Sequence, residues 1–81
     1  MRYLPQNLRS LREYFRFSQR DIAEAGDVKQ PLVVKFERGE KTPSLRAVKG
    51  IADLFGVTID EMINTPPDKL IAAVDGRERK T

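Results

Sequence analysis

The sequence predicts an all-α fold, a compact domain of five helices, from three observations. Apolar residues recur at the three- and four-residue spacing of amphipathic helices along most of the chain. These apolar segments are separated by residues that start and stop helices. Ser or Thr stands before a segment, and Gly stands after it. The 81 residues, 40% hydrophobic and 33% charged, suffice for one small folded domain and are too few for two.

The first predicted helix covers about residues 5–15, with Pro5 in its first turn, a position that proline favours. Its apolar residues are Leu4, Leu8, Leu11 and Phe15. Arg12 falls within the same apolar arc. Its charged end must therefore either reach solvent or meet a buried acidic partner.

The second predicted helix begins at Gln19. Ser18 can cap it, and Asp21 occupies the reciprocal position of a capping box. The helix is expected to end near Gly26 and Asp27, because both residue types tolerate the left-handed conformation of a tight turn.

The third predicted helix, residues 30–38, carries apolar residues on too many sides for all of them to face one core. At 100° per residue, one arc holds Leu32, Val33 and Phe36, and the opposite arc holds Gln30, Pro31, Val34 and Lys35. Glu37 lies on the flank between these arcs, and Gly39 ends the helix.

The fourth predicted helix starts after the cap Ser44 and runs to Phe55. A glycine weakens a helix interior, so Gly50 needs an explanation. Two readings stay open for it: neutral drift, or the close approach of another helix.

The fifth predicted helix is short and ends near Asn64, with Thr58 and Glu61 at the two positions of a second capping box. We therefore expect a domain over residues 1–65, followed by a short tail, residues 66–81, that could form two turns of helix before its charged end frays. Three apolar residues of the tail either cover the base of the domain or meet a second subunit: Leu70, Ile71 and Val74.

The chemistry available to the chain is narrow. It contains neither Cys nor His, which excludes Cys nucleophiles, His bases and nearly all zinc, copper and haem ligand sets. Carboxylates such as Asp21 and Glu61 already have helix-capping roles, and no nucleophile has an adjacent base. We therefore predict that the protein is not an enzyme and has no metal or organic cofactor. No apolar run reaches the roughly 18 residues of a membrane span, and the N-terminus lacks a signal-peptide core, so a cytoplasmic protein without membrane association is expected.

The charge distribution has two readings. The net charge of +3 and the pI near 9.5 are compatible with a polyanionic partner. The first twenty residues hold one acidic and five basic side chains: Glu13 against Arg2, Arg9, Arg12, Arg16 and Arg20. A solvated helix face explains this excess as well as a nucleic-acid partner does.

The second and third predicted helices form a recognisable unit. Two short helices joined by a tight turn, the second with a polar outer face, are a pattern that enters the major groove of DNA. The residues FSQRDIAEAGDVKQPLVVKFERGEKTPSL, followed by IADLFGVTIDEMI, carry this pattern. Over Leu8 to Ile63, without a gap, the sequence resembles the XRE-like helix-turn-helix family of phage Cro and lambda-type repressors.

This resemblance implies a lambda-repressor-like fold and a transcriptional regulator, a repressor that binds double-stranded DNA as a homodimer on an inverted repeat. It implies that Gln19 contacts a DNA phosphate and that Arg12 and Glu37 form a buried ion pair between the first and third helices. Its base-contact positions fall on Lys29, Gln30, Pro31 and Lys35. Val34 joins them by geometry alone.

The side chains match this role chemically. Gln30 can bond to an adenine edge, Lys29 or Lys35 can donate to guanine, and the apolar pair Pro31 and Val34 can pack on thymine methyl groups. Arg38 and Lys41, in and after the third helix, are expected to contact phosphates. Arg9, Arg16 and Arg20 stay unassigned.

The sequence departs from the family pattern at three places. Arg16 stands where Gly commonly ends the first helix, so a different turn is expected there. Gly26 followed by Asp27 replaces the usual apolar residue followed by Gly, which removes one core side chain. Lys29 occupies a capping position usually held by Ser or Thr, so the third helix should begin less firmly.

A second function stays open on the same fold. The protein could be a protein-interaction module, such as an antitoxin or regulatory domain. In that case Pro31, Val34 and the apolar tail would dock on another protein, and the identity of a partner or anti-repressor is not given by the sequence.

Overall fold

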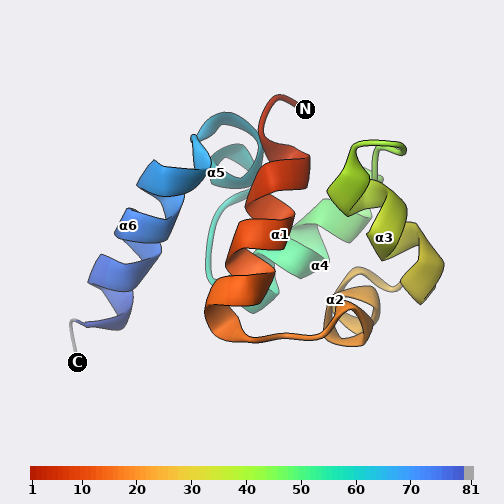
Figure 1. Ribbon diagram of the computed structural model, residues 1–81, viewed down its shortest axis with the longest axis horizontal. Helices are drawn as coiled ribbons and strands as arrows, with labels where there is room; N and C mark the ends of the chain where they lie inside the picture. The colour runs from red at the N-terminus through yellow and green to blue at the C-terminus, as the bar shows by residue number, and fades with distance from the viewer. Residues whose placement is uncertain (80–81) are drawn as a thin grey trace.

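The computed structural model describes residues 1–79, and within that range the chain forms six helices and no strand. They are α1 (Leu4–Phe15), α2 (Gln19–Gly26), α3 (Gln30–Arg38), α4 (Leu45–Phe55), α5 (Ile59–Asn64) and α6 (Pro67–Glu78), as Figure 1 shows. The predicted all-α fold is confirmed. The predicted number of five helices is wrong, because the tail forms a sixth.

The sixth helix arises where the sequence suggested a break. Pro66 and Pro67 do not end the helical part of the chain, because Pro67 takes the first position of α6, where its missing N–H costs nothing. The tail then stays helical for 12 residues, longer than the two turns expected. Its last two residues, Lys80 and Thr81, lie outside the described residues.

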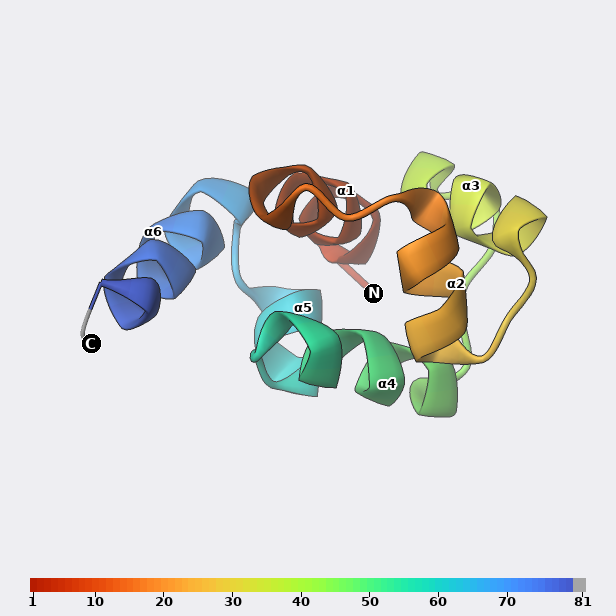
Figure 2. The ribbon, with the colours of Figure 1, turned by 90° about the horizontal axis from the view of Figure 1, so that it is seen from below.

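α1 lies between the two ends of the molecule. It contacts α3 on one side and α5 and α6 on the other, and both views place α3 and α6 at opposite ends (Figures 1 and 2). All six helices contribute buried apolar side chains to one core: Leu4, Leu8, Leu11, Ile22, Ala23, Val33, Phe36, Val48, Ile51, Ala52, Phe55, Met62, Leu70 and Val74. Leu70 and Val74 are thus buried within the chain itself, where they pack against the core.

Side-chain caps fix three helix starts as the sequence predicts. Ser18 and Asp21 form the capping box of α2, with Ser18 Oγ accepting from the Asp21 backbone N–H at 3.0 Å. Ser44 caps α4 in the same way at 3.1 Å. Thr58 and Glu61 form the second capping box, at the start of α5. These caps satisfy backbone donors that the first turn of a helix leaves unpaired.

Two turns near α2 use non-glycine residues in the left-handed region. Arg16 ends α1 with φ 61°, and Asp27 ends α2 with φ 53°. The turn after α1 is therefore an ordinary left-handed one, and the expectation that Arg16 would change it is wrong. An arginine in this conformation costs roughly 1–2 kcal/mol relative to a right-handed residue.

Close packing of α2 against α4 explains the glycine inside α4. A Cβ added to Gly50 would lie 2.1 Å from the carbonyl oxygen of Ala25, so only glycine fits. The reading of Gly50 as a close helix approach is confirmed. At Gly26 this chain lacks the apolar side chain of the family pattern, and Ile51 fills the space. The Cδ1 atom of Ile51 would lie 3.1 Å from a Cβ added to Gly26.

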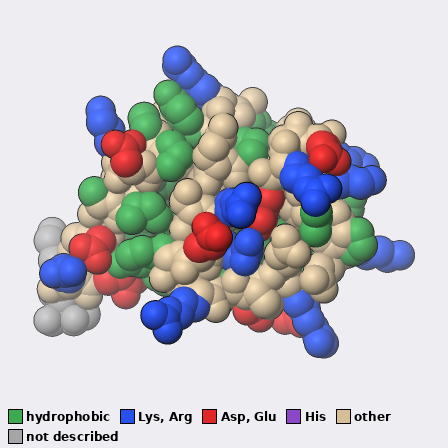
Figure 3. All heavy atoms as spheres, viewed as in Figure 1, with side chains coloured by type: hydrophobic (Ala, Val, Ile, Leu, Met, Phe, Trp, Pro, Cys, Tyr) green, Lys and Arg blue, Asp and Glu red, His purple; other side chains and the backbone are tan. Residues whose placement is uncertain are grey.

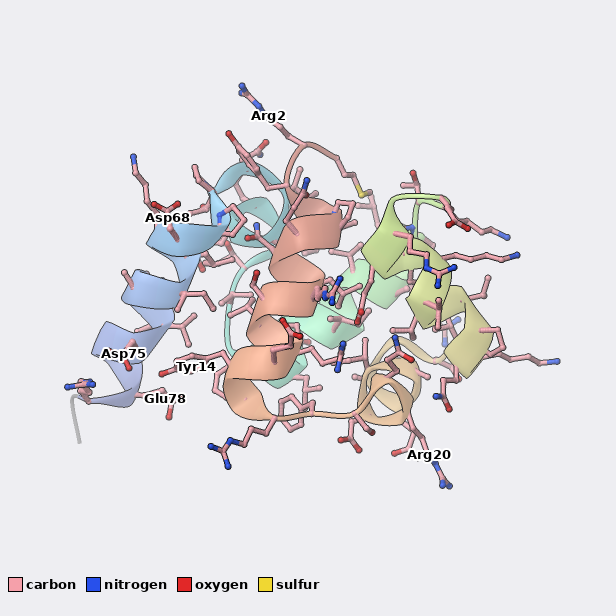
Figure 4. The ribbon with its side chains drawn as sticks, viewed as in Figure 1. Arg2, Tyr14, Arg20, Asp68, Asp75 and Glu78 are labelled. Carbon is pink, nitrogen blue, oxygen red and sulfur yellow. The ribbon has the colours of Figure 1, made fainter. Side chains whose placement is uncertain are left out.

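Polar side chains fasten the α5–α6 end. Asn7, fully buried on α1, donates through its amide to the carbonyl oxygens of Met62 (2.9 Å) and Thr65 (2.8 Å) at the end of α5. Tyr14 points from α1 toward α6 and donates to Asp75 at 2.9 Å (Figure 4). No helix within residues 1–79 combines the length and apolar character needed to cross a membrane.

Candidate nucleic-acid interface

α2 and α3 form a helix-turn-helix at one end of the molecule. Only residues 27–29 separate the two helices, and α2 also contacts α4 while α3 contacts α1. The side of α3 turned away from α1 and α2 lies at the edge of the molecule (Figure 1). This arrangement leaves one face of α3 free to meet a large partner.

The two arcs predicted for α3 face in different directions. Val33 and Phe36 are buried, at 0% and 3% exposed, and Leu32 packs against the core while half-buried. On the opposite arc, Gln30, Pro31 and Lys35 are exposed and Val34 is half-buried, and Lys29, just before the helix, is exposed as well. The helix is therefore held by one apolar edge and presents a polar one.

A hollow of about 430 Å³ runs along this polar edge, and we call it the outer hollow. It is lined by Gln30, Pro31, Val34, Lys35, Arg38 and Glu40. Val34, the half-buried member, and Pro31 are its apolar lining residues, and an amide, two cationic groups and the Glu40 carboxylate complete the lining. Such a surface offers both hydrogen-bond donors and apolar contact.

An ion pair fixes α3 against α1. Arg12 Nε lies 2.6 Å from Glu37 Oε2, and Arg12 Nη2 donates to Glu37 Oε1 at 3.1 Å. The two side chains are 18% and 7% exposed, so the pair is largely desolvated. The hydrogen bond to Glu37 raises the pKa of Arg12, and the neighbouring carboxylate charges act in the same direction. Glu37 is thus the buried acidic partner that the position of Arg12 in the apolar arc required.

Gln19 joins this pair from the start of α2. Its Nε2 donates to Glu37 Oε1 at 3.5 Å. An amide nitrogen carries two hydrogens, so the second N–H of Gln19 stays available for another acceptor. Glu37 therefore links α1, α2 and α3 at one point.

Two further hollows flank α3. The inner hollow, about 200 Å³, lies among α1, α2 and α3 and is lined by Arg9, Arg12, Gln19, Val34, Glu37 and Arg38. The acidic hollow, about 480 Å³, lies between α2 and the start of α3 and is lined by Arg20, Ala23, Glu24, Asp27, Val28 and Gln30. The outer hollow shares Val34 and Arg38 with the first and Gln30 with the second, so the three hollows adjoin along α3.

Basic side chains gather over the α3 end of the molecule (Figure 3). Lys29, Lys35 and Lys41 are exposed, and none of the three forms an ion pair within residues 1–79. Arg38 approaches Glu40 at 3.9 Å, with both side chains more than half exposed. Exposed pairs of this kind contribute little, so these cations are available to a polyanion.

The start of α3 lacks, within the described residues, a side-chain cap of the kind that α2, α4 and α5 have. Lys29 precedes the helix, and within residues 1–79 its side chain makes no capping hydrogen bond. A less firm start of α3 at Lys29 stays a prediction that this absence of a capping bond supports. Glu40 is a residue of this surface that the sequence reading missed, although its place between Arg38 and Lys41 was a signal.

The sequence of the chain matches a known protein family. The family described as Helix-turn-helix, HTH_3, matches residues 8–62. That is more than half of the chain, so the protein belongs to this helix-turn-helix family, and the resemblance to the XRE-like family is confirmed.

One relative has a transcriptional description. It is called HTH-type transcriptional regulator DdrOP3, from Deinococcus deserti, and is 32% identical over 60 residues. The aligned region is 74% of this chain and 46% of the relative, so the chain spans about half the length of the curated relative that it matches. No solved structure matches the chain at a significant level.

Proposed function

We propose that the protein is a sequence-specific double-stranded DNA-binding transcriptional regulator that inserts α3 into the major groove and has no enzymatic activity. The helix-turn-helix family match and the name of the transcriptional relative support this function. The observation that carries the proposal is the polar edge of α3, where exposed Gln30 and Lys35 rise beside the half-buried Val34. A major groove presents hydrogen-bonding base edges and thymine methyl groups, which this edge complements.

Each residue of the outer arc has a proposed role in reading bases. Gln30 bonds bidentately to an adenine edge, and Lys29 or Lys35 donates to guanine O6 and N7. Pro31 and Val34 pack against thymine methyl groups. The apolar lining residues of the outer hollow support this last role, because packing them on a methyl group leaves no hydrogen-bonding group without a partner.

Phosphate contacts are proposed on both sides of α3. Gln19 has one amide N–H directed at Glu37 and a second available for a phosphate oxygen. Arg38 ends α3 and Lys41 follows it, both exposed. These contacts would fix the register of α3 in the groove without reading sequence.

We further propose that the regulator is a repressor acting as a homodimer on an inverted repeat. One small domain makes few contacts, and two half-sites a helical turn apart reinforce each other. α6 has less apolar surface for a partner than the sequence suggested, because Leu70 and Val74 are buried. Leu54, 39% exposed at the end of α4, offers apolar surface near the start of α5 and is the proposed centre of the contact.

A protein-docking module is the second candidate, because the apolar lining residues of the outer hollow also suit an apolar side chain of another protein. Salt dependence separates the two candidates. Log affinity for DNA falls by about 0.9 per log unit of salt for each phosphate contacted, whereas apolar docking does not weaken in this way.

The test is fluorescence anisotropy of a labelled mixed-sequence duplex, titrated with the protein at several salt concentrations. We expect binding that weakens steeply with salt and a smaller slope for the Lys41→Ala variant. Absence of DNA binding at low salt, with the fold intact by circular dichroism, would contradict the proposal.

A further inference from the structure

The inner hollow combines features of an anion site. Its lining comes from three helices and includes residues as distant in sequence as Arg9 and Arg38. Its volume of about 200 Å³ corresponds to roughly six or seven waters at ~30 Å³ each. A tetrahedral oxyanion with some hydration can therefore enter it.

The charges around the inner hollow favour an anion. Three guanidinium groups and one carboxylate line it, a net charge of +2. The carboxylate of Glu37 is already occupied, because Arg12 contacts both of its oxygens and Gln19 donates to one of them. The negative charge in the hollow is thus neutralised by Arg12, and the charges of Arg9 and Arg38 remain.

Arg9 is held only loosely in its present position. Its Nε lies 3.8 Å from Glu13 Oε2 on the same helix, and the two side chains are 65% and 59% exposed. Exposed pairs of this type contribute little to stability, so Arg9 can exchange Glu13 for a phosphate at little cost. Charge-assisted bonds between guanidinium and phosphate are stronger than that pair.

The opposite flank of α3 has the reverse charge. Glu24 and Asp27 outnumber Arg20 around the acidic hollow, a net charge of −1. Arg46 approaches Asp27 at 3.8 Å from outside this hollow, but both side chains are more than four-fifths exposed and the pair is weak. In Figure 4, Arg20 points outward, away from the body of the molecule. A phosphate strand lying over the acidic hollow would therefore meet less positive charge than one lying over the inner hollow.

We propose that the inner hollow binds one backbone phosphate of the duplex, and that Arg9 of α1 is a phosphate-contacting residue beside Gln19. The inference rests on the proposed DNA-binding function. The inner hollow adjoins the outer hollow through Val34 and Arg38, so a phosphate there borders the bases that α3 reads. The charge difference between the two flanks then places the nearest phosphate strand on the α1 side of α3.

The chain offers matched variants for a test. Arg9, Arg20 and Arg79 are each exposed and each paired with an acid four residues away in the sequence. Arg9 lines the inner hollow, Arg20 lines the acidic hollow, and Arg79 lies just beyond α6 at the far end of the molecule. Changing each to Ala removes the same charge at three different places.

The measurement is the slope of log affinity against log salt, for a duplex that the wild-type protein binds. Arg9→Ala should reduce the magnitude of the slope by about 0.9 for each copy of the chain bound. Arg9→Lys should largely restore it, because the charge is kept. Arg20→Ala and Arg79→Ala should leave the slope at the wild-type value.

The possible results separate this inference from the proposed function. If wild-type binding depends on salt but Arg9→Ala keeps the full slope, the phosphate site at the inner hollow is wrong and the DNA-binding function stands. If Arg20→Ala reduces the slope as much as Arg9→Ala, the proposed asymmetry of the two flanks is wrong. If the wild-type protein shows no salt-dependent binding to any duplex, both proposals fail together.

Discussion

At the α6 end of the molecule, polar side chains are used to fasten the fold, and at the α3 end most of them are left free. Arg77 donates to Glu61 at 3.3 Å and Tyr14 to Asp75 at 2.9 Å, so α6 is tied to α5 and to α1. Around α3, the one strongly desolvated pair is Arg12 with Glu37, and the exposed lysines lie in open solvent. Similar residue types therefore stabilise one end and remain available for binding at the other.

The helix starts also differ in their capping: α1, α3 and α6 begin without a side-chain cap within residues 1–79. α2, α4 and α5 begin with side-chain caps, and α5 is further held by Asn7 at its other end. α3 begins at Lys29 without such a cap within residues 1–79. If Lys29 contacts DNA as proposed, this position exchanges a capping residue for a binding one, a trade of stability for contact that functional sites commonly make.

The largest effect on the α3 end should come from breaking its buried ion pair. Arg12→Met leaves the Glu37 carboxylate, 7% exposed, without its partner, and should lower the free energy of unfolding by about 3–5 kcal/mol. The double variant Arg12→Met with Glu37→Met removes both charges and should be more stable than the single one. Urea denaturation followed by circular dichroism measures both. A double variant less stable than Arg12→Met would contradict this account of the pair.

Changes on the outer arc should affect binding and leave the fold intact. Gln30→Ala and Lys35→Ala should each weaken binding to a preferred site by about 1–3 kcal/mol, because each removes a proposed base contact. Their unfolding free energies should stay within about 0.5 kcal/mol of the wild type, since both side chains are exposed. Lys69→Ala, an exposed lysine on α6, is the control and should change neither quantity. Anisotropy titration and urea denaturation provide the two measurements.

The stability supplied by the α6 end should depend on pH, and changes at this end should leave DNA affinity unchanged. The hydrogen bond from Arg77 lowers the pKa of Glu61, and the backbone N–H of Thr58 adds to this effect. A lowered pKa means that the charged carboxylate stabilises the fold fully above the ordinary glutamate pKa of about 4.3, and that this is lost as pH falls through the lowered value.

Glu61→Gln should therefore cost about 1 kcal/mol at pH 7, because Arg77 is half exposed and the pair is partly screened, and little at a pH below the lowered pKa of Glu61. Thermal melts at several pH values test this. Equal destabilisation at both pH values, or a loss of DNA affinity, would show that the two ends are not separated as described.

The smallest effect should come from restoring a cap to α3. Lys29→Ser places a hydroxyl where the helix start lacks a side-chain acceptor, and should raise the unfolding free energy by about 0.5–1 kcal/mol. The same change removes a proposed base contact and should weaken DNA binding. A variant that gained stability and kept full affinity would remove Lys29 from the reading residues.

Local signals predicted most of the helix boundaries. Ser18, Ser44 and Thr58 each mark a helix start by the hydrogen bond that their side chains make, and Gly39 and Gly56 end helices with φ near 72°. Such features depend on a few neighbouring residues and are readable in sequence. The arcs of α3 were predictable for the same reason, because helical periodicity fixes which residues share a face.

Features that depend on distant segments were not predictable in the same way. α6 was underestimated because its length depends on Leu70 and Val74 packing against the core, which the double proline obscured. The inner hollow joins Arg9, Gln19 and Arg38 only after α1, α2 and α3 have packed. The Arg12–Glu37 pair could be expected only from the family resemblance, since the two residues are 25 positions apart.

We propose above all that the polar edge of α3 reads a DNA sequence. The most direct test is to mix the purified protein with random-sequence duplexes at near-physiological salt, recover the bound fraction and sequence it, in parallel with the Gln30→Ala variant. We predict that the wild type enriches a two-fold-symmetric site and that the preference at one position of each half-site is lost in the variant. A folded wild-type protein that enriches no sequence at any soluble concentration would contradict the claim.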